Sequence, residues 1–232
     1  MSLPQHVVLI PDGNRRWAAQ KGKPGYFGHR AGAKSAEKIF AYVHKIGLPC
    51  VTFWGCSYGN VTERNPVEIK FLFAIFEQYF KTLSKREEIK KDKIRIQILG
   101  RWEEVFPERV KKVMRGLIEE TRNHGGRKLT FLMAYDGRDE MQAAIKSIVG
   151  AGIAPPKITR ETIKENLWAK NLPPVDLVIR TGGEPHWSAG LLMWDVAEAQ
   201  LYFTNILWPD FSPEELKKAL DLYAGTERRH GK

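Results

Sequence analysis

Short apolar runs alternate along the chain with longer segments whose apolar positions recur every three or four residues. The first pattern predicts strands and the second predicts amphipathic helices. Strands are expected at residues 6–10, 50–55, 94–99, 129–135, 175–181 and 201–204, and helices near residues 31–46, 67–85, 107–123, 138–149 and 159–170. A last helix starts after Ser212, where Pro213 and Glu215 complete a capping box. This order predicts an α/β fold with a mostly parallel central sheet flanked by helices.

The composition is that of an ordinary globular protein. The chain has 232 residues, of which 43% are hydrophobic and 28% charged, and no Ser-, Gly- or Pro-rich linker divides it. A single domain over residues 1–232 is therefore expected. No apolar stretch reaches the roughly 18 residues of a membrane span, and the N-terminus lacks the layout of a signal peptide. We expect a cytoplasmic protein in which Cys50 and Cys56 are reduced core thiols.

The net charge of +10 predicts an anionic partner. Nucleic acid, an anionic membrane surface and a phosphorylated substrate all satisfy the charge alone. The chain has no recognised nucleic-acid-binding motif and no single strongly basic helix, so no nucleic-acid partner is expected.

Polar clusters follow four of the predicted strands directly. Any one of them could be ordinary loop chemistry, because Gly, Asp and Asn favour turns. In an open α/β sheet, however, ligands bind outside the carboxyl ends of the strands. Four clusters at one edge therefore predict a binding site, and they are residues 12–14, Ser57 with Asn60, residues 135–138 and residues 180–184.

The first cluster points to diphosphate chemistry. Asp12 after a strand is commonly a helix N-cap, but Gly13 permits close backbone approach, and the donors of Asn14, Arg15 and Arg16 exceed what a cap needs. His29 lies just before a predicted helix. It is either a half-exposed polar residue or part of an anion site at the helix N-terminus, and the sequence leaves both interpretations open.

Two further arginines have competing interpretations. Arg64 and Glu68 are four residues apart at the start of a helix, where a surface ion pair is the simpler interpretation. Arg180 ends an apolar strand and is followed by Thr181, two glycines and Glu184, a combination that favours phosphate binding.

The helix over residues 67–85 carries more aromatic side chains than one core-facing stripe requires. Most of them belong to the core, and the surplus predicts an apolar tunnel. Phe71, Phe76 and Phe80 are expected to limit its length. A diphosphate site next to an apolar tunnel fits a prenyl diphosphate.

The chain resembles the cis-prenyltransferases, whose best-known member is undecaprenyl diphosphate synthase. The resemblance rests on blocks in their usual order: HVVLIPDGNRRWA, FGHRAGAKS, FWGCSYGN, AYDGRDE, PVDLVIRTGGE, LYFTNILWPDF and a closing ERRHG. It implies a Mg²⁺-dependent homodimer, cytoplasmic and in peripheral contact with membranes. The implied reaction condenses isopentenyl diphosphate with an allylic diphosphate such as farnesyl diphosphate to form a Z-polyprenyl diphosphate.

The resemblance also implies roles for individual residues. Asp12 would engage Mg²⁺ and assist departure of the allylic diphosphate, with Glu68 supporting the site. The residues implied to cradle that diphosphate are Gly13, Asn14, Arg15, Arg16, His29 and Arg64. Asn14 and Ser57 would lie near the condensing carbons. The isopentenyl diphosphate would be held by Arg180 and Ser188, and by Arg229 and Gly231 of the other subunit. Trp17, Asn60 and His186 complete the implied substrate-binding set.

Several positions depart from the family pattern. Gly25 and His186 replace arginines, although Arg15 adds a positive charge where the pattern has glycine. The stretch PHWSAG is one residue longer than in the pattern. Gln200 replaces a glutamate associated with the metal and is kept as a metal-site candidate. These departures leave an irregular or short-chain prenyl diphosphate synthase, and a non-catalytic partner subunit, as alternatives.

Overall fold

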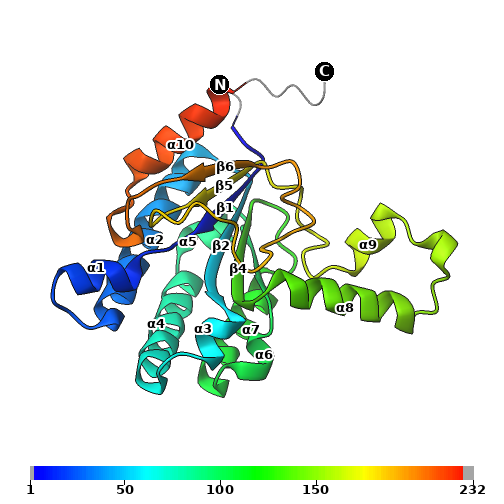
Figure 1. Cartoon of the computed structure of the whole chain (residues 1–232), viewed down its shortest axis with the longest axis horizontal. Coiled ribbons are helices and arrows are strands. Elements are labelled where there is room, and N and C mark those ends of the chain that lie inside the picture. Colours follow the sequence, from blue (N-terminus) through cyan, green and yellow to red (C-terminus); the bar gives the residue numbers. More distant parts are fainter. Residues whose placement is uncertain (1–2, 227–232) are drawn as a thin grey trace.

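A six-stranded sheet in the order β3-β4-β2-β1-β5-β6 forms the centre of the molecule (Figure 1). The structure is a computed structural model that describes residues 3–226. Its strands are β1 His6–Ile10, β2 Cys50–Ser57, β3 Arg95–Leu99, β4 Lys128–Tyr135, β5 Leu177–Arg180 and β6 Gln200–Phe203. Every neighbouring pair of strands is parallel, which confirms the predicted α/β class. The sheet was predicted to be mostly parallel and is entirely parallel.

Helices connect the strands and cover the sheet. They are α1 Asn14–Gln20, α2 Gly25–Ile46, α3 Tyr58–Thr62, α4 Pro66–Ser84, α5 Glu87–Lys91, α6 Trp102–Val105, α7 Glu108–Thr121, α8 Gly137–Gly150, α9 Arg160–Asn166 and α10 Pro213–Gly225, with 3₁₀-helices at Pro155–Lys157 and Trp208–Asp210. Each predicted helix is present, whereas the short helices α1, α3, α5 and α6 were not predicted.

Some predicted boundaries were wrong. Helix α2 begins at Gly25, six residues before the predicted start, so His29 lies inside the helix rather than before it. Helix α9 ends at Asn166 instead of residue 170, and β5 is shorter at both ends than predicted. The capping box at α10 is half formed: Ser212 Oγ accepts from the Glu215 N–H at 3.4 Å, while the Glu215 carboxylate pairs with Lys218.

The early start of α2 has a packing reason. A Cβ at Gly28 would lie 1.9 Å from the Asn14 carbonyl oxygen, and one at Gly32 would lie 2.1 Å from Asn14 Oδ1. Glycine normally disfavours a helix interior. Here it allows α2 to approach the start of α1 more closely than any other residue would, and this tertiary contact outweighs the local propensity.

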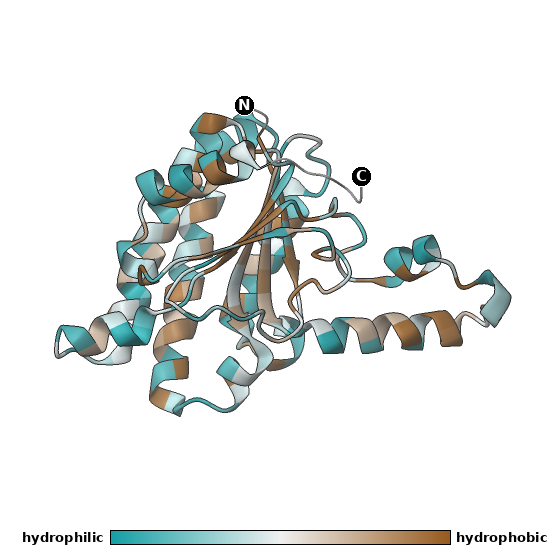
Figure 2. Ribbon diagram, turned by 45° about the horizontal axis from the view of Figure 1, so that its top comes forward, coloured by the Kyte–Doolittle hydropathy of each residue, from teal (hydrophilic) through white to brown (hydrophobic). Residues whose placement is uncertain are grey.

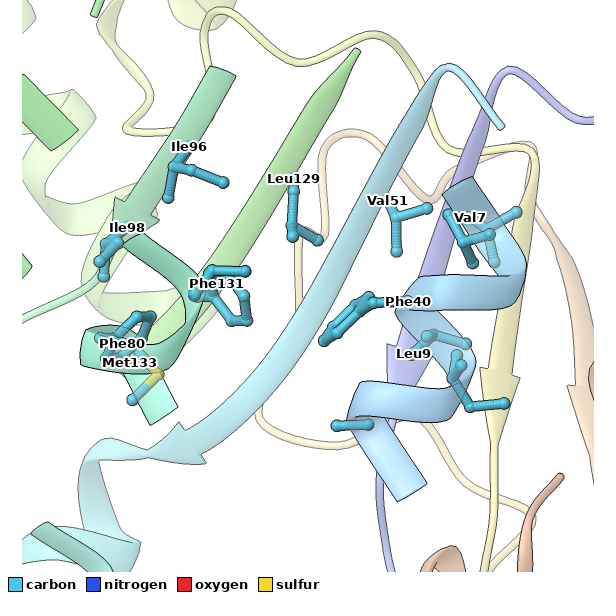
Figure 3. Close-up of a cluster of buried hydrophobic side chains, with 14 of the residues drawn as sticks. Val7, Leu9, Phe40, Val51, Phe80, Ile96, Ile98, Leu129, Phe131 and Met133 are labelled. Atoms are coloured by element: carbon cyan, nitrogen blue, oxygen red, sulfur yellow. The ribbon is translucent and has the colours of Figure 1, made fainter. Parts of the chain in front are cut away.

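The core lies on both faces of the sheet. Figure 3 shows Val7 and Leu9 of β1 beside Phe40 of α2, with Phe131 and Met133 of β4 in the same cluster. The intervening residues of β1 and β4 pack on the opposite face. A parallel sheet buried on both sides gives the uninterrupted apolar runs seen in the sequence. Cys50 and Cys56 are buried free thiols, as predicted.

Helices α8 and α9 project from the body as an arm, defined here as residues 137–166 (Figures 1 and 2). Its exposed apolar side chains include Ile145 and Val149 of α8 and Ile158 in the connection to α9. Over residues 3–226, no helix is long and apolar enough to cross a membrane.

His6 makes stability depend on pH. Its Nδ1–H donates to the Pro173 carbonyl and its Nε2 accepts from the Thr52 hydroxyl, each at 2.8 Å. Burial lowers the pKa of His6 from 6.5 to about 4. The unfolded chain therefore binds more protons than the folded protein between these values, and stability falls as the pH drops through this window. We expect His6 to contribute a loss of about 3 kcal/mol in unfolding free energy between pH 7 and pH 4.

Urea unfolding at both pH values measures this loss. His6→Gln, which cannot titrate, should show a correspondingly smaller difference between the two pH values. An equal difference in both proteins would contradict the assignment to His6.

Candidate active site

Asp12 and Arg180 meet at the carboxyl edge of the sheet. Ile10 of β1 is in register with Arg180 of β5, so Asp12 lies two residues beyond the paired strands. Asp12 Oδ2 is 2.9 Å from Arg180 Nη2, and Asp12 Oδ1 is 3.2 Å from Arg16 Nη2. The carboxylate therefore bridges two guanidinium groups. Asp12 does not cap α1, because the N-cap is Gly13 at φ 105° and no side chain caps that end.

Arg180 ties Asp12 to the chain that follows β5. Its side chain is only 6% exposed, and its Nη1 donates to the carbonyl oxygen of His186 at 2.7 Å. The His186 side chain is 56% exposed and lies 3.7 Å from Glu184. His186 thus contributes its backbone to the site, and the structure does not bring its imidazole into the cavity described below.

Asn14 is the first residue of helix α1, and its side-chain oxygen has no hydrogen-bond partner among the described residues. Its Nδ2 donates to the Pro11 carbonyl at 3.3 Å, whereas its Oδ1 is buried without a hydrogen-bond partner. A buried acceptor in this state costs about 1–3 kcal/mol. Asn14 lines the cavity, while this oxygen is buried against Gly32 of α2.

His29, Arg64 and Glu68 form a partly buried cluster. Glu68 Oε1 is 3.0 Å from His29 Nε2 and 3.4 Å from Arg64 Nη1. Burial is the main cause that lowers the pKa of His29, so the neutral ring donates its Nε2–H to Glu68. The Arg64 and Glu68 side chains are each 19% exposed. The ion pair expected from the spacing is therefore present, but it is partly buried beside the cavity rather than on the surface.

Arg15 fills the space beside Gly25. A Cβ at Gly25 would lie 3.3 Å from Arg15 Cγ and 3.9 Å from Glu68 Oε1. Arg15 lines the cavity, so the positive charge missing at Gly25 has a neighbouring replacement at Arg15.

A cavity of about 460 Å³ joins these groups. The predicted site residues that line it are Asp12, Gly13, Asn14, Arg15, Arg16, His29, Ser57, Asn60, Arg64, Arg180 and Ser188. Glu68 stands behind His29 and Arg64 rather than on the cavity wall. With four arginines against Asp12 and Glu184, the lining is net positive and suits a polyanion.

A smaller apolar cavity of about 70 Å³ adjoins the first and shares five lining residues with it, Pro11, Asn14, His29, Gly55 and Leu72. Phe76 and Phe80 of α4 line it, as predicted, together with Phe131 and Trp208. Phe71 does not line it. The Phe71 ring is 42% exposed and stacks on Tyr26 at 4.3 Å, so its predicted place in a tunnel is wrong.

Other predicted residues lie elsewhere. Trp17 Nε1 donates to Asp210 Oδ1 at 2.8 Å, and Trp17 does not line the cavity. Gln200 begins β6 in register with Leu177, three residues before the level of Arg180. At about 3.3 Å per residue this places Gln200 roughly 10 Å from the carboxyl edge. One chain therefore does not bring Gln200 to Asp12. Arg229 and Gly231 lie outside the described residues.

Eight lining residues were not among the predicted site residues: Ile10, Pro11, Trp54, Gly55, Cys56, Leu72, Glu184 and Ala189. Glu184 belongs to the predicted polar cluster of residues 180–184 but was given no individual role, and its Oε1 is 3.6 Å from Arg16 Nη1. Nothing in the sequence marks Leu72 or Trp54 as a site residue, since apolar side chains at these positions are equally consistent with the hydrophobic core.

The cationic cavity lies at the carboxyl edge of the parallel sheet and is continued by an apolar cavity. In an α/β protein this combination suits an amphiphilic diphosphate. The family model described as "Putative undecaprenyl diphosphate synthase" matches residues 10–231. The chain belongs to this family of prenyltransferases, which confirms the resemblance seen in the sequence.

Curated relatives and a solved structure agree with this membership. The chain is 37% identical to the isoprenyl transferase of Aquifex aeolicus, covering 100% of this chain and 97% of the relative. It is 38% identical to the (2E,6E)-farnesyl-diphosphate-specific ditrans,polycis-undecaprenyl-diphosphate synthase of Buchnera aphidicola, covering 100% and 92%. The crystal structure of lavandulyl diphosphate synthase from Lavandula x intermedia, in complex with dimethylallyl diphosphate, superposes with a TM-score of 0.90 at 28% identity and covers 99% of both chains.

Proposed function

We propose that this prenyltransferase condenses isopentenyl diphosphate with an allylic prenyl diphosphate to form a Z-prenyl diphosphate. The observation that carries the proposal is the Asp12 carboxylate held between Arg16 and Arg180, at a cationic cavity that leads into an apolar one. The first cavity matches a diphosphate and the second the start of a hydrocarbon tail. Relatives specific for farnesyl diphosphate and for geranylgeranyl diphosphate, the latter from Thermococcus kodakarensis, support an allylic primer.

The donor set fits Mg²⁺. This ion is commonly bound through one or two carboxylates together with substrate phosphates. Asp12 provides such a carboxylate, and its side chain is 33% exposed on the cavity wall. Over residues 3–226 no cluster of three or more potential metal-ligating His, Cys, Asp or Glu side chains occurs, so the substrate's phosphates would complete the coordination. When bound, the ion would neutralise charge on the departing diphosphate.

The proposed reaction breaks the C1–O bond of the allylic diphosphate and joins C1 to C4 of isopentenyl diphosphate. The leaving diphosphate takes the electron pair of the broken bond. A proton from C2 of isopentenyl diphosphate passes to the released diphosphate, and the new double bond forms between C2 and C3. Arg15, Arg16 and Arg64 would receive the charge that develops on the leaving group. Arg180 and Ser188 would hold the second diphosphate.

The apolar cavity supports a short product. Its volume of about 70 Å³ is far below the roughly 300–1,000 Å³ of pockets that enclose drug-sized ligands. A growing chain would meet Phe76 and Phe80 early.

Incorporation of labelled isopentenyl diphosphate tests the proposal. The assay contains Mg²⁺ and offers dimethylallyl, geranyl, farnesyl or geranylgeranyl diphosphate in parallel, with chromatographic sizing of the products. Incorporation with at least one primer, abolished by a chelator, is expected. No incorporation with any primer would contradict the proposal and leave the partner-subunit alternative. The residues that line the cationic cavity argue against that alternative, because a non-catalytic subunit does not need to bind a diphosphate.

A second candidate is irregular coupling of two dimethylallyl diphosphate molecules. The similarity to lavandulyl diphosphate synthase in complex with dimethylallyl diphosphate favours it. So does the position of the His186 side chain outside the cavity lining. A product formed from labelled dimethylallyl diphosphate with Mg²⁺, in the absence of isopentenyl diphosphate, would establish it.

We also propose that the protein is a homodimer formed through the arm. Ile145 and Val149 lie one turn apart on α8, with 56% and 72% of their surfaces exposed, and a second copy of the arm would cover them. We expect Ile145→Glu with Val149→Glu to convert the dimer into a monomer in light scattering after size exclusion. Leu222→Glu, at a 61% exposed position of α10, is the matched control. A double variant that stays dimeric would contradict this interface.

Cytoplasmic location with peripheral membrane contact completes the proposal, because a prenyl product partitions into lipid. Cell fractionation would test it.

A further inference from the structure

The loop of residues 188–192 forms one wall of the cavity and has an unusual backbone. Ser188 and Ala189 line the cavity. Ala189, Gly190 and Leu192 have φ angles of 48°, 57° and 44°. Left-handed backbone is unfavourable for residues that carry a side chain, so the surroundings must hold Ala189 and Leu192 in place.

A buried chain of hydrogen bonds holds the loop. The Leu192 N–H donates to Tyr135 Oη at 3.1 Å, and the Tyr135 hydroxyl donates to Glu140 Oε2. Glu140 Oε1 accepts from the Ala169 N–H at 2.7 Å. Tyr135 is 0% exposed and Glu140 is 3% exposed. Both carboxylate oxygens and the hydroxyl therefore have partners, and the chain fixes the position of Leu192.

Gly137 provides a second connection from the same region. Its N–H donates to the Ala189 carbonyl at 2.9 Å, and a Cβ at Gly137 would lie 1.7 Å from the Gly190 carbonyl oxygen. Tyr135 ends β4, while Gly137 and Glu140 belong to the first turn of α8. The end of β4 and the start of α8 thus hold the loop in position.

We infer that Tyr135 and Glu140 are positioning residues for the second substrate: they hold the 188–192 loop so that Ser188 faces the diphosphate of isopentenyl diphosphate. Neither residue lines the cavity, so their effect passes through the loop. The inference rests on the proposed function for the identity of that diphosphate. A misplacement of about 1 Å can cost about 100-fold in rate, so a loose loop would be costly.

Tyr135→Phe removes one oxygen and keeps the ring. We expect it to raise the Kd for isopentenyl diphosphate in calorimetry, and the KM in turnover, by about tenfold. The KM for the allylic substrate should change less than about twofold, because the ion pairs of Asp12 and Arg16 join Arg180 and Glu184, outside this loop. Tyr42→Phe, at a partly buried tyrosine that lines neither cavity, is the control.

Glu140→Gln provides the second variant. The Tyr135 hydroxyl and the Ala169 N–H donate to different carboxylate oxygens, so in the glutamine one of these donors would face the amide nitrogen. We expect the same selective loss, and the double variant should lose little more than the larger single variant because both act in one hydrogen-bonded chain.

The two proposals fail in distinguishable ways. Absence of turnover in the wild-type protein contradicts the proposed function, while the binding measurement still tests the loop. A lower melting temperature with an unchanged Kd for isopentenyl diphosphate in both variants, or equal weakening of both substrates, would overturn the positioning role.

Discussion

Asp12→Asn is expected to lower kcat by about 1,000-fold while the protein stays folded. The substitution keeps the shape of the side chain and removes the charge that lies between Arg16 and Arg180. It also removes the carboxylate proposed to engage Mg²⁺. Metal ions and preorganised charges supply several kcal/mol of stabilisation to a developing anion, and each 1.36 kcal/mol is a factor of ten. Steady-state turnover with saturating Mg²⁺ and both substrates measures the loss.

Asp210→Asn is the matched control for Asp12. Asp210 accepts a hydrogen bond from Trp17 Nε1 and does not line the cavity. We expect its kcat to stay within about twofold of wild type, because the amide oxygen preserves that hydrogen bond. Circular dichroism and thermal unfolding of both variants separate loss of chemistry from loss of fold. If Asp12→Asn kept more than a tenth of the wild-type kcat, its proposed role would be wrong.

Phe76→Ala is expected to lengthen the product by about one isoprene unit. Phe76 lines the apolar cavity and stacks on Phe106 at a centroid distance of 5.8 Å. Its ring has six carbons and an isoprene unit has five, so removal of the ring opens room for about one more unit. Some loss of stability accompanies the change, since truncating a buried Phe costs about 3–5 kcal/mol and Phe76 is only partly buried. Chromatographic sizing of the products at a temperature well below unfolding measures the shift.

Phe71→Ala is the control on the same helix. The Phe71 ring stacks on Tyr26 outside both cavities, and its removal should leave the product distribution unchanged. Identical product lengths in wild type and Phe76→Ala would show that this wall does not limit the chain. A longer product from Phe71→Ala would show that the exposed start of α4 contributes instead.

The sheet was predictable because its strands are buried on both faces. Burial of this kind produces the uninterrupted apolar runs at residues 6–10 and 129–135, and polar residues appear where burial stops. Because the polar residues that follow parallel strands meet at one edge of the sheet, the sequence also predicted that Asp12, Ser57 and Arg180 would lie together. The short helices were missed because α1 and α3 have too few residues to show a helical period. The start of α2 was predicted too late because glycine residues locally disfavour a helix.

The sequence by itself determined the α/β class, the family, and the strand ends at which the site lies. These follow from local patterns of burial and from motifs that need only neighbouring residues. Only the tertiary structure decided which groups meet. The Asp12–Arg180 pair spans 168 positions, and the contact from Tyr135 to Leu192 spans 57. The direction of a side chain on a helix also depends on what packs against it, which is why Phe76 faces the cavity and Phe71 faces Tyr26. Such contacts depend on the packing of distant segments, which no local pattern encodes.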